Sequence, residues 1–192
     1  MKKKIILSIV AVLLVAIIGV TSYFNFIRPL SINVTEVRCE NWDATYVGVK
    51  AFEEMYNKGE YNKDTTVIHS FNGKLPSDNP KDYMSVYIDI DVKNRNWFQM
   101  YSVDGYISNI EKYQDMALYS ATMGDVEETN VFRNSNKSGT IVLDLYVGNH
   151  SDDEIKEFVK SITINMSGKG KIIGKKKMSI KLADIEKITI ER

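Results

Sequence analysis

The chain begins with an uncharged apolar stretch that lies between two basic ends. Residues 5–27 contain no charged side chain, whereas Lys2, Lys3 and Lys4 precede them and Arg28 follows. A helix of these 23 residues is about 35 Å long at 1.5 Å per residue. Because a hydrocarbon core is about 30 Å thick, such a helix crosses it with some tilt. The pattern predicts a transmembrane helix over 5–27 that contacts the lipid bilayer.

This stretch differs from a secretory signal peptide in its length and in its C-terminal end. Signal peptides have an apolar region of about 7–15 residues and a cleavage site of the A-x-A type. Here the apolar run 5–20 is longer, and the best site, after Ser22, lacks that form. The aromatic belt expected at a membrane interface is represented by Tyr23, Phe24 and Phe26. The sequence favours an uncleaved signal anchor, and the alternative is secretion after cleavage near Ser22.

The flanking charges predict the orientation. Basic residues next to a span stay in the cytoplasm, so the N-terminus is expected inside and the body outside. The expected organisation is a cytoplasmic stub 1–4, a transmembrane helix 5–27 and an extracytoplasmic domain 28–192, in a single-pass protein of the plasma membrane. A stub of this size excludes a receptor that signals through its own cytoplasmic domain. Cys39 lies eleven residues after Arg28, which is too far for a lipobox.

The body is dominated by alternation between apolar and polar positions. The clearest example is 84–92, with apolar residues at Met84, Val86, Ile88, Ile90 and Val92. Residues 139–147 repeat it, with inward positions at Ile141, Leu143, Leu145 and Val147. This period of two is typical of half-buried strands in an antiparallel sheet. Asp144, between two inward positions, is expected to face solvent.

Shorter stretches rich in β-branched and aromatic residues predict further strands. They cover 31–40, 65–71, 97–103, 106–110, 116–122, 126–132, 163–166, 178–182 and 186–191. The polar stretch 133–139 predicts a turn. The sequence therefore predicts a mostly β protein, in which an antiparallel β-sandwich with one or two short helices, immunoglobulin-like in the broad sense, follows the N-terminal transmembrane helix.

Two segments of the body have helical patterns. Residues 44–57 follow a potential cap at Asp43, although a strand over 45–49 is the alternative. Residues 151–162 begin with a capping box formed by Ser151 and Glu154. Their apolar face consists of Ile155, Phe158, Val159 and Ile162.

The formal net charge of zero conceals an uneven distribution. Residues 29–165 carry 13 basic and 22 acidic side chains, whereas 166–192 carry 8 basic and 3 acidic ones. Because nucleic-acid binding needs an excess of Lys and Arg, the acidic body argues against it.

The basic tail contains one unusual cluster around three glycines. Its lysines are Lys169, Lys171, Lys175, Lys176, Lys177 and Lys181. Near an anionic surface each lysine contributes about 1 kcal/mol, so a polyanion site for lipid headgroups or an anionic envelope polymer is one hypothesis. The alternative is a solvated edge hairpin, in which lysines prevent pairing with other sheets.

Residues able to carry chemistry are few. Asp89 and Asp91 share one face of a strand, but a Ca²⁺ site needs six to eight oxygens, so we interpret them as a solvated surface. His69 and His150 lie far apart, and neither H-x-x-H nor C-x-x-C occurs. Cys39 is the single cysteine and has no catalytic context. The sequence predicts no catalytic residue, metal site or cofactor.

Together these features predict a non-catalytic binding or scaffolding module of the bacterial cell envelope. Its expected partners are the bilayer, an anionic polymer or headgroup, and another envelope protein. The alternative is a membrane-tethered or secreted hydrolase whose dispersed active site leaves no motif.

The uncleaved anchor can be tested by fractionation. The mature protein should begin at or near Met1 and stay with membranes after an alkaline wash, because the 23-residue span is not cut. N-terminal sequencing that starts near Tyr23, with the protein in the medium, would contradict the anchor.

Overall fold

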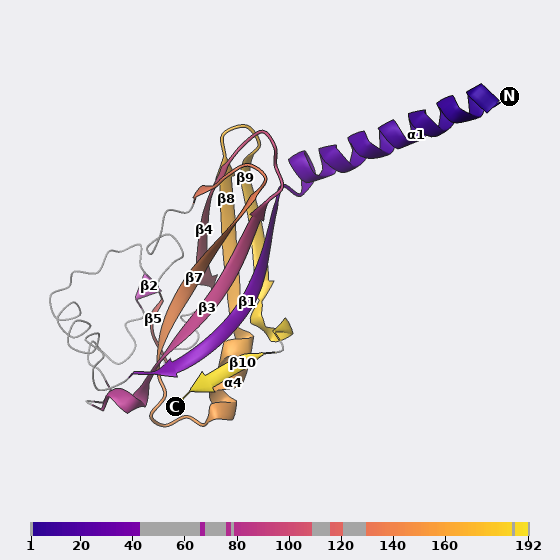
Figure 1. Cartoon of the computed structure of the whole chain (residues 1–192). Helices are drawn as coiled ribbons and strands as arrows, with labels where there is room; N and C mark the ends of the chain where they lie inside the picture. The colour runs from indigo at the N-terminus through magenta and orange to yellow at the C-terminus, as the bar shows by residue number, and fades with distance from the viewer. Residues whose placement is uncertain are drawn as a thin grey trace.

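The computed structural model describes residues 2–42, 66–67, 76–77, 79–108, 116–120, 130–185 and 187–191. A long helix, α1 (Lys2–Ser22), projects from a β-rich body (Figure 1). It continues as a π-helical turn, η1 (Tyr23–Ile27). Residues Lys3–Ile27 are long and apolar enough to cross a membrane, a property that signal sequences share. The helix therefore fits a membrane anchor or a signal sequence.

Within the described residues, six strands form the first sheet in the order β10-β1-β3-β7-β5-β2. Their bounds are β10 (Ile188–Glu191), β1 (Leu30–Asn41), β3 (Tyr83–Asn94), β7 (Ser135–Tyr146), β5 (Ala117–Ser120) and β2 (Thr66–Val67). β10 runs parallel to β1, and the other pairs are antiparallel. β10 covers only the Val37–Glu40 part of β1, so the first half of β1 has no described strand on that side.

The second sheet contains four described strands in the order β6-β4-β8-β9. They are β6 (Asn130–Val131), β4 (Tyr101–Ser108), β8 (Thr163–Gly170) and β9 (Gly174–Lys181). Two 3₁₀ turns, η3 (Pro80–Asp82) and η5 (Leu182–Asp184), and the helix α4 (Asp152–Ser161) complete the described elements. In α4 the predicted capping box of Ser151 and Glu154 is present.

The core lies between the two sheets. The apolar positions that the alternation predicts in β3, in β7 and just after β7 are all buried: Met84, Val86, Ile88, Ile90, Val92, Ile141, Leu143, Leu145 and Val147. The apolar face of α4 adds Ile155, Phe158 and Val159. The mostly β, sandwich-like fold with an N-terminal apolar helix is thereby confirmed, whereas the finer immunoglobulin-like arrangement stays a prediction.

Three predicted boundaries are wrong near the loops beside α1. The predicted strands 97–103 and 106–110 are replaced by one strand, β4, which begins at Tyr101, because side-chain amides take up the backbone groups of the preceding loop. The predicted turn 133–139 is mostly strand, since β7 begins at Ser135 and pairs with the end of β3. The hairpin strands β8 and β9 exceed 163–166 and 178–182.

Two glycines explain why the predicted length of β8 was too short. A Cβ at Gly168 would collide with the side chain of Leu30, and one at Gly170 would collide with Gln99. Both glycines therefore allow close packing in a strand, although their local propensity disfavours one. The predicted helix 44–57, its alternative strand 45–49, most of 65–71, 121–129 and His69 lie outside the described residues.

The expectation that Asp144 faces solvent is wrong. Asp144 points to the outer face of the first sheet, but it is only 8% exposed because Trp42 covers this part of the sheet. Trp42 Nε1 donates to Ser85 Oγ at 2.8 Å, and Ser85 Oγ donates to Asp144 Oδ1 at 2.5 Å. Burial raises the pKa of the Asp144 carboxyl to about 6, although hydrogen bonds with Ser85 and Trp42 lower it.

Asp144 should make the stability of the fold depend on pH. The pKa of Asp144 is higher in the folded state than the usual 3.8, so the folded state binds this proton more tightly than the unfolded state does. The stability that the bound proton contributes is therefore lost as pH rises from about 4 to about 6. Asp144→Asn should therefore be more stable than the wild type at pH 7, by up to about 3 kcal/mol. The difference should close near pH 4 in denaturant titrations.

The exposed Asp104 provides the control. Asp104→Asn should change the free energy of unfolding by less than about 0.5 kcal/mol at either pH. An Asp144→Asn difference of equal size at pH 4 and pH 7 would show that the ionised carboxyl is not penalised in the fold.

Candidate functional site

The helix is joined to the body through Asn25, the one amide in its last turn. Asn25 is 1% exposed. Its Nδ2 donates to Thr21 O at 2.8 Å, and its Oδ1 accepts from the backbone N–H of Trp97 at 2.8 Å. Its own carbonyl accepts from Asn96 Nδ2 at 2.6 Å. The end of the helix is therefore hydrogen-bonded to the loop 95–100 of the body.

Three further buried amides connect this loop with its neighbours. Asn94 Nδ2 donates to the carbonyls of Gln99, at 3.0 Å, and Phe132, at 2.9 Å. Asn96 Oδ1 accepts from the N–H groups of Phe98 and Gln99, at 2.7 and 2.8 Å. Gln99 Oε1 accepts from Ile172 N at 2.7 Å. One amide network thus holds the loops 95–100, 132–134 and 171–173 together.

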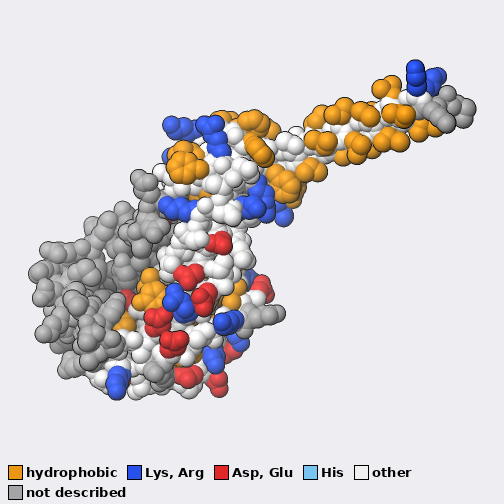
Figure 2. All heavy atoms as spheres, viewed as in Figure 1, with side chains coloured by type: hydrophobic (Ala, Val, Ile, Leu, Met, Phe, Trp, Pro, Cys, Tyr) orange, Lys and Arg blue, Asp and Glu red, His pale blue; other side chains and the backbone are white. Residues whose placement is uncertain are grey.

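We call the described segments 23–31, 92–102, 130–138 and 168–177 the anchor end. The strand registers bring them together, since Leu30 pairs with Asn94, Asn94 with Ser135, and Tyr101 with both Val131 and Gly170. They contain no Asp or Glu and ten cations: Arg28, Lys93, Arg95, Arg133, Lys137, Lys169, Lys171, Lys175, Lys176 and Lys177. Figure 2 shows blue and orange side chains near the helix, with the acidic ones farther along the body.

Five of the six predicted lysines belong to this end. Lys169 and Lys175 are direct partners across the hairpin, and Lys177 follows on the same outer face. Lys176 points the other way, and its Nζ donates to the Phe26 carbonyl at 3.2 Å. Lys171 lies in the three-residue loop that ends at Gly174, which has φ +73°.

Lys181 is separated from the others. It pairs with Thr163 at the far end of the hairpin, about 20 Å from Lys175 at about 3.3 Å per residue. The structure therefore divides the predicted cluster into five lysines near the helix and one near α4.

The arrangement of the lysines favours the binding of an anion. Like charges directly opposite each other in a sheet are destabilising, and Lys169 faces Lys175. Arg38 and Lys160 form ion pairs with carboxylates, and both lie outside the anchor end. A bound anion would relieve this repulsion.

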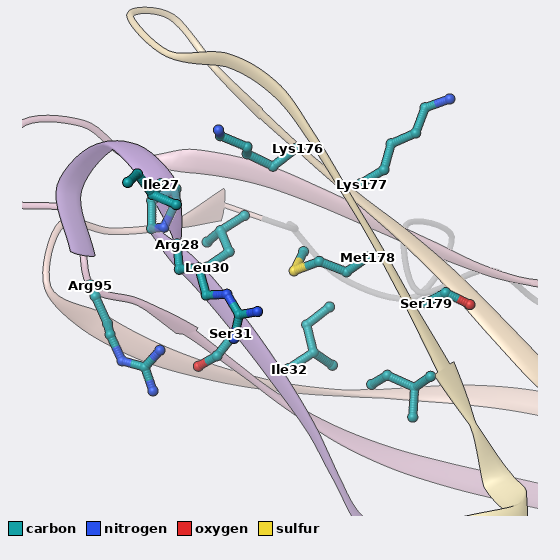
Figure 3. A pocket seen from close by; sticks show the side chains of 12 residues that line it. Ile27, Arg28, Leu30, Ser31, Ile32, Arg95, Lys176, Lys177, Met178 and Ser179 are labelled. Atoms are coloured by element: carbon teal, nitrogen blue, oxygen red, sulfur yellow. The ribbon is translucent and has the colours of Figure 1, made fainter. Parts of the chain in front are cut away.

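A groove opens beside the helix, between the first half of β1 and the edge strand β9. Its volume is about 480 Å³. The side chains of Leu30, Ile32 and Met178 point into it (Figure 3), whereas Lys177 points away. Its cationic lining residues are Arg28, Arg95, Lys176 and Lys177. The groove is apolar inside and basic at its rim, and the described residues that line it include no carboxylate, histidine or cysteine.

The other residues with potential chemistry have structural partners. Asp89 accepts from Arg38 Nη2 at 3.2 Å and Thr140 Oγ1 at 2.6 Å, and Asp91 accepts from Ser138 Oγ at 2.6 Å. In the part of the chain that the structure describes, no three His, Cys, Asp or Glu side chains form a group that could hold a metal.

The remaining nucleophile and histidine lie away from the anchor end. Cys39 is fully buried, and desolvation raises the pKa of its thiol to about 12. The thiolate needed for nucleophilic attack is therefore disfavoured. His150 lies between β7 and α4 and is partly buried.

From the sequence alone we assigned no role to Asn25, the loop amides, Arg95 or Arg133. A signal was present, because Asn94, Asn96 and Gln99 interrupt a strand-like sequence within six residues. Asn25 is also an unusual residue within the apolar span. Their connection depends on long-range register and could not be seen locally.

Removal of the central amide should loosen this end. Asn96→Ala deletes the donor to Asn25 and the acceptor for Phe98 and Gln99, which leaves buried polar groups unpaired and should cost about 1–3 kcal/mol. Denaturant titration in detergent would measure the loss. Hydrogen exchange should accelerate at Trp97, Phe98 and Gln99.

The matched control is Asn33→Ala on β1, whose side chain is exposed. It should change stability by less than about 0.5 kcal/mol. Equal effects of the two substitutions would show that the amide network does not hold the loops.

Comparisons with known proteins add little. No family model matches the chain, and no curated protein matches it. Among solved structures, the chain is similar to the crystal structure of YcdA, a candidate lipoprotein of Bacillus subtilis subsp. subtilis str. 168, with 9% identity and a TM-score of 0.32. The match covers 82% of this chain and 38% of YcdA, so the chain spans less than half the length of that protein. A likeness this distant says nothing about function.

Proposed function

We propose that the protein is a single-pass membrane protein of the bacterial envelope, with a cytoplasmic N-terminus and an extracytoplasmic β body. The body acts as a non-catalytic binding or scaffolding module, and its anchor end rests on anionic lipid headgroups. The observation that carries this proposal is the set of ten cations, without an Asp or Glu in the same segments, at the end from which α1 leaves.

The position of the cations at the anchor end favours contact with lipid headgroups over contact with a more distant polymer. Lys176 contacts the Phe26 carbonyl, and Phe26 belongs to the apolar span. The surrounding cations therefore lie beside the point where the helix would enter the bilayer. Charges interact within a Debye length of about 8–10 Å at physiological salt, so proximity to the headgroups decides their effect. Near an anionic membrane each contributes about 1 kcal/mol.

The opposite end suits a protein partner. There α4 exposes Asp152, Asp153, Glu154 and Glu157, and β10 forms the edge of the first sheet. With the anchor end on the membrane, these groups face away from it and are accessible to another envelope protein.

The alternative of a tethered or secreted hydrolase has less support. The groove at the anchor end is lined by cations and apolar side chains. The carboxyl with a raised pKa, Asp144, lies under Trp42. A hydrolase would need a base and a nucleophile at one accessible pocket, and the described side chains favour binding instead.

Amine labelling of the full chain in nanodiscs tests the headgroup contact. In discs that contain phosphatidylglycerol, Lys169, Lys171, Lys175 and Lys177 should react several-fold more slowly than in neutral phosphatidylcholine discs. The exposed lysines Lys81, Lys181 and Lys187 serve as internal controls and should react equally in both. At about 1 M salt, where the Debye length is about 3 Å, the protection should disappear.

Charge removal provides the matched variants. The triple change Lys175→Gln, Lys176→Gln and Lys177→Gln should abolish protection of Lys169, whereas Lys81→Gln, Lys181→Gln and Lys187→Gln should not. Equal labelling in neutral and anionic discs would refute the headgroup contact. Protection by a soluble teichoic-type polymer in neutral discs, without protection by anionic lipid, would replace the headgroup with an envelope polymer.

A further inference from the structure

The anchor end also exposes large apolar side chains. Outside α1 and η1, the described large hydrophobic residues that are exposed are Trp97, Phe98, Met100, Tyr106, Phe132 and Ile172. All of these except Tyr106 lie in the three loops of the anchor end. Trp97, Phe98, Phe132 and Ile172, which we call the loop tips, are each between 56% and 69% exposed. Such a concentration marks an interaction surface.

The loops bury polar side chains and expose apolar ones, which is the reverse of the usual arrangement. A loop in water commonly exposes polar residues and buries apolar ones. Here the amides of Asn94, Asn96 and Gln99 are buried, at 0%, 0% and 4% exposure, and the apolar side chains point outward. Because the buried amides bind the loop backbone, they fix the loops in this conformation. The exposed apolar tips are therefore a preorganised feature.

The loop tips contact the end of the apolar span. The Phe98 ring stacks on the Phe26 ring, with centroids 6.4 Å apart, and Trp97 N donates to Asn25 Oδ1. About 20 helical residues cross a hydrocarbon core, so a span that begins at Ile5 reaches its far boundary near Phe24. Asn25 and Phe26 then lie at that boundary, and the residues that touch them lie there too.

Each of the three loops carries a cation close to its apolar tip. Arg95 precedes Trp97 by two residues, Arg133 follows Phe132, and Lys171 precedes Ile172. The Arg95 guanidinium also lies over the Phe24 ring, 5.2 Å from its centroid. Aromatic side chains prefer the membrane interface, and long cationic side chains reach from it to the headgroups.

We propose that Trp97, Phe98, Phe132 and Ile172 insert into the interfacial layer of the bilayer that carries α1. This inference rests on the proposed membrane function and adds a second, apolar contact to the electrostatic one. The contact holds the body on the membrane surface at a fixed inclination, because the helix end and three loops are attached at the same place.

Two tryptophans allow a direct test, since the chain has no others. Trp97 is 62% exposed at the anchor end, whereas Trp42 is 3% exposed at the end of β1 that is distant from the helix. In nanodiscs with brominated lipids, the fluorescence of Trp97 is obtained as the difference in emission between the wild type and Trp97→Phe. Bromine near the headgroup end of the acyl chains should quench this emission at least two-fold. Trp42, the emitter that remains in Trp97→Phe, should be quenched little.

A spin label gives a second measurement that does not depend on tryptophan. Ile172→Cys can be labelled selectively because Cys39 is buried and its pKa is raised. The label should be more accessible to oxygen than to a soluble nickel chelate. A label at Asp153→Cys on α4 should show the reverse.

The outcomes separate this inference from the proposed function. Quenching of Trp97 that persists at 1 M salt supports insertion, since apolar contact is not screened. Lysine protection without Trp97 quenching overturns insertion and leaves the headgroup contact standing. Quenching in both neutral and anionic discs without lysine protection supports insertion and refutes the electrostatic proposal.

A third result would identify a different occupant. If Trp97 is shielded from water-soluble quenchers but not quenched by brominated lipid, a protein surface covers the loop tips. A second copy of the chain or another protein would then be the partner, and insertion into lipid would be excluded.

Discussion

The hydrogen bonds of Asn25 are the constraint on which the arrangement of this protein depends. An amide at the end of an apolar helix has to find partners, because a buried and unpaired polar group is costly. The Asn25 side chain donates to Thr21 O and accepts from Trp97 N, and the Asn25 backbone carbonyl accepts from Asn96 Nδ2. Trp97 and Asn96 belong to a loop of the body. The helix is therefore attached at one defined place, and that place decides which end of the β body is nearest to the apolar span.

Charge and exposed apolar side chains are both distributed unevenly between the two ends of the β body. The segments next to the helix contain ten cations and exposed aromatic tips, whereas α4 at the other end carries acidic side chains. Both ends bury polar groups, but of different kinds. Near the helix they are neutral amides that organise loops, and on the outer face of the first sheet they are Ser85 and Asp144 beneath Trp42. The first set shapes a surface, and the second makes the fold sensitive to pH.

The basic hairpin shows how far a local pattern can be trusted. Six lysines around glycines indicated an unusual segment, and five of them do lie beside the helix. Lys181 does not, because the hairpin strands are longer than their propensities suggested. The glycines that made β8 look like a loop are required where Leu30 and Gln99 pack against its backbone. Composition thus located the segment, and packing decided its extent.

Local patterns were enough to predict the apolar helix, the mostly β body, the inward faces of β3 and β7 and the capping box of α4. These features depend on periodicity and on neighbours within four residues, so they can be recognised locally. Packing between distant segments buries Asp144 and brings the arginines of the loops to the lysines of the hairpin. It also brings the apolar tips of three loops to the end of the helix. Those relations depend on strand order and on hydrogen bonds between residues about 40 to 75 positions apart, such as Asn94–Val131 and Asn25–Asn96, and no local pattern encodes such distances.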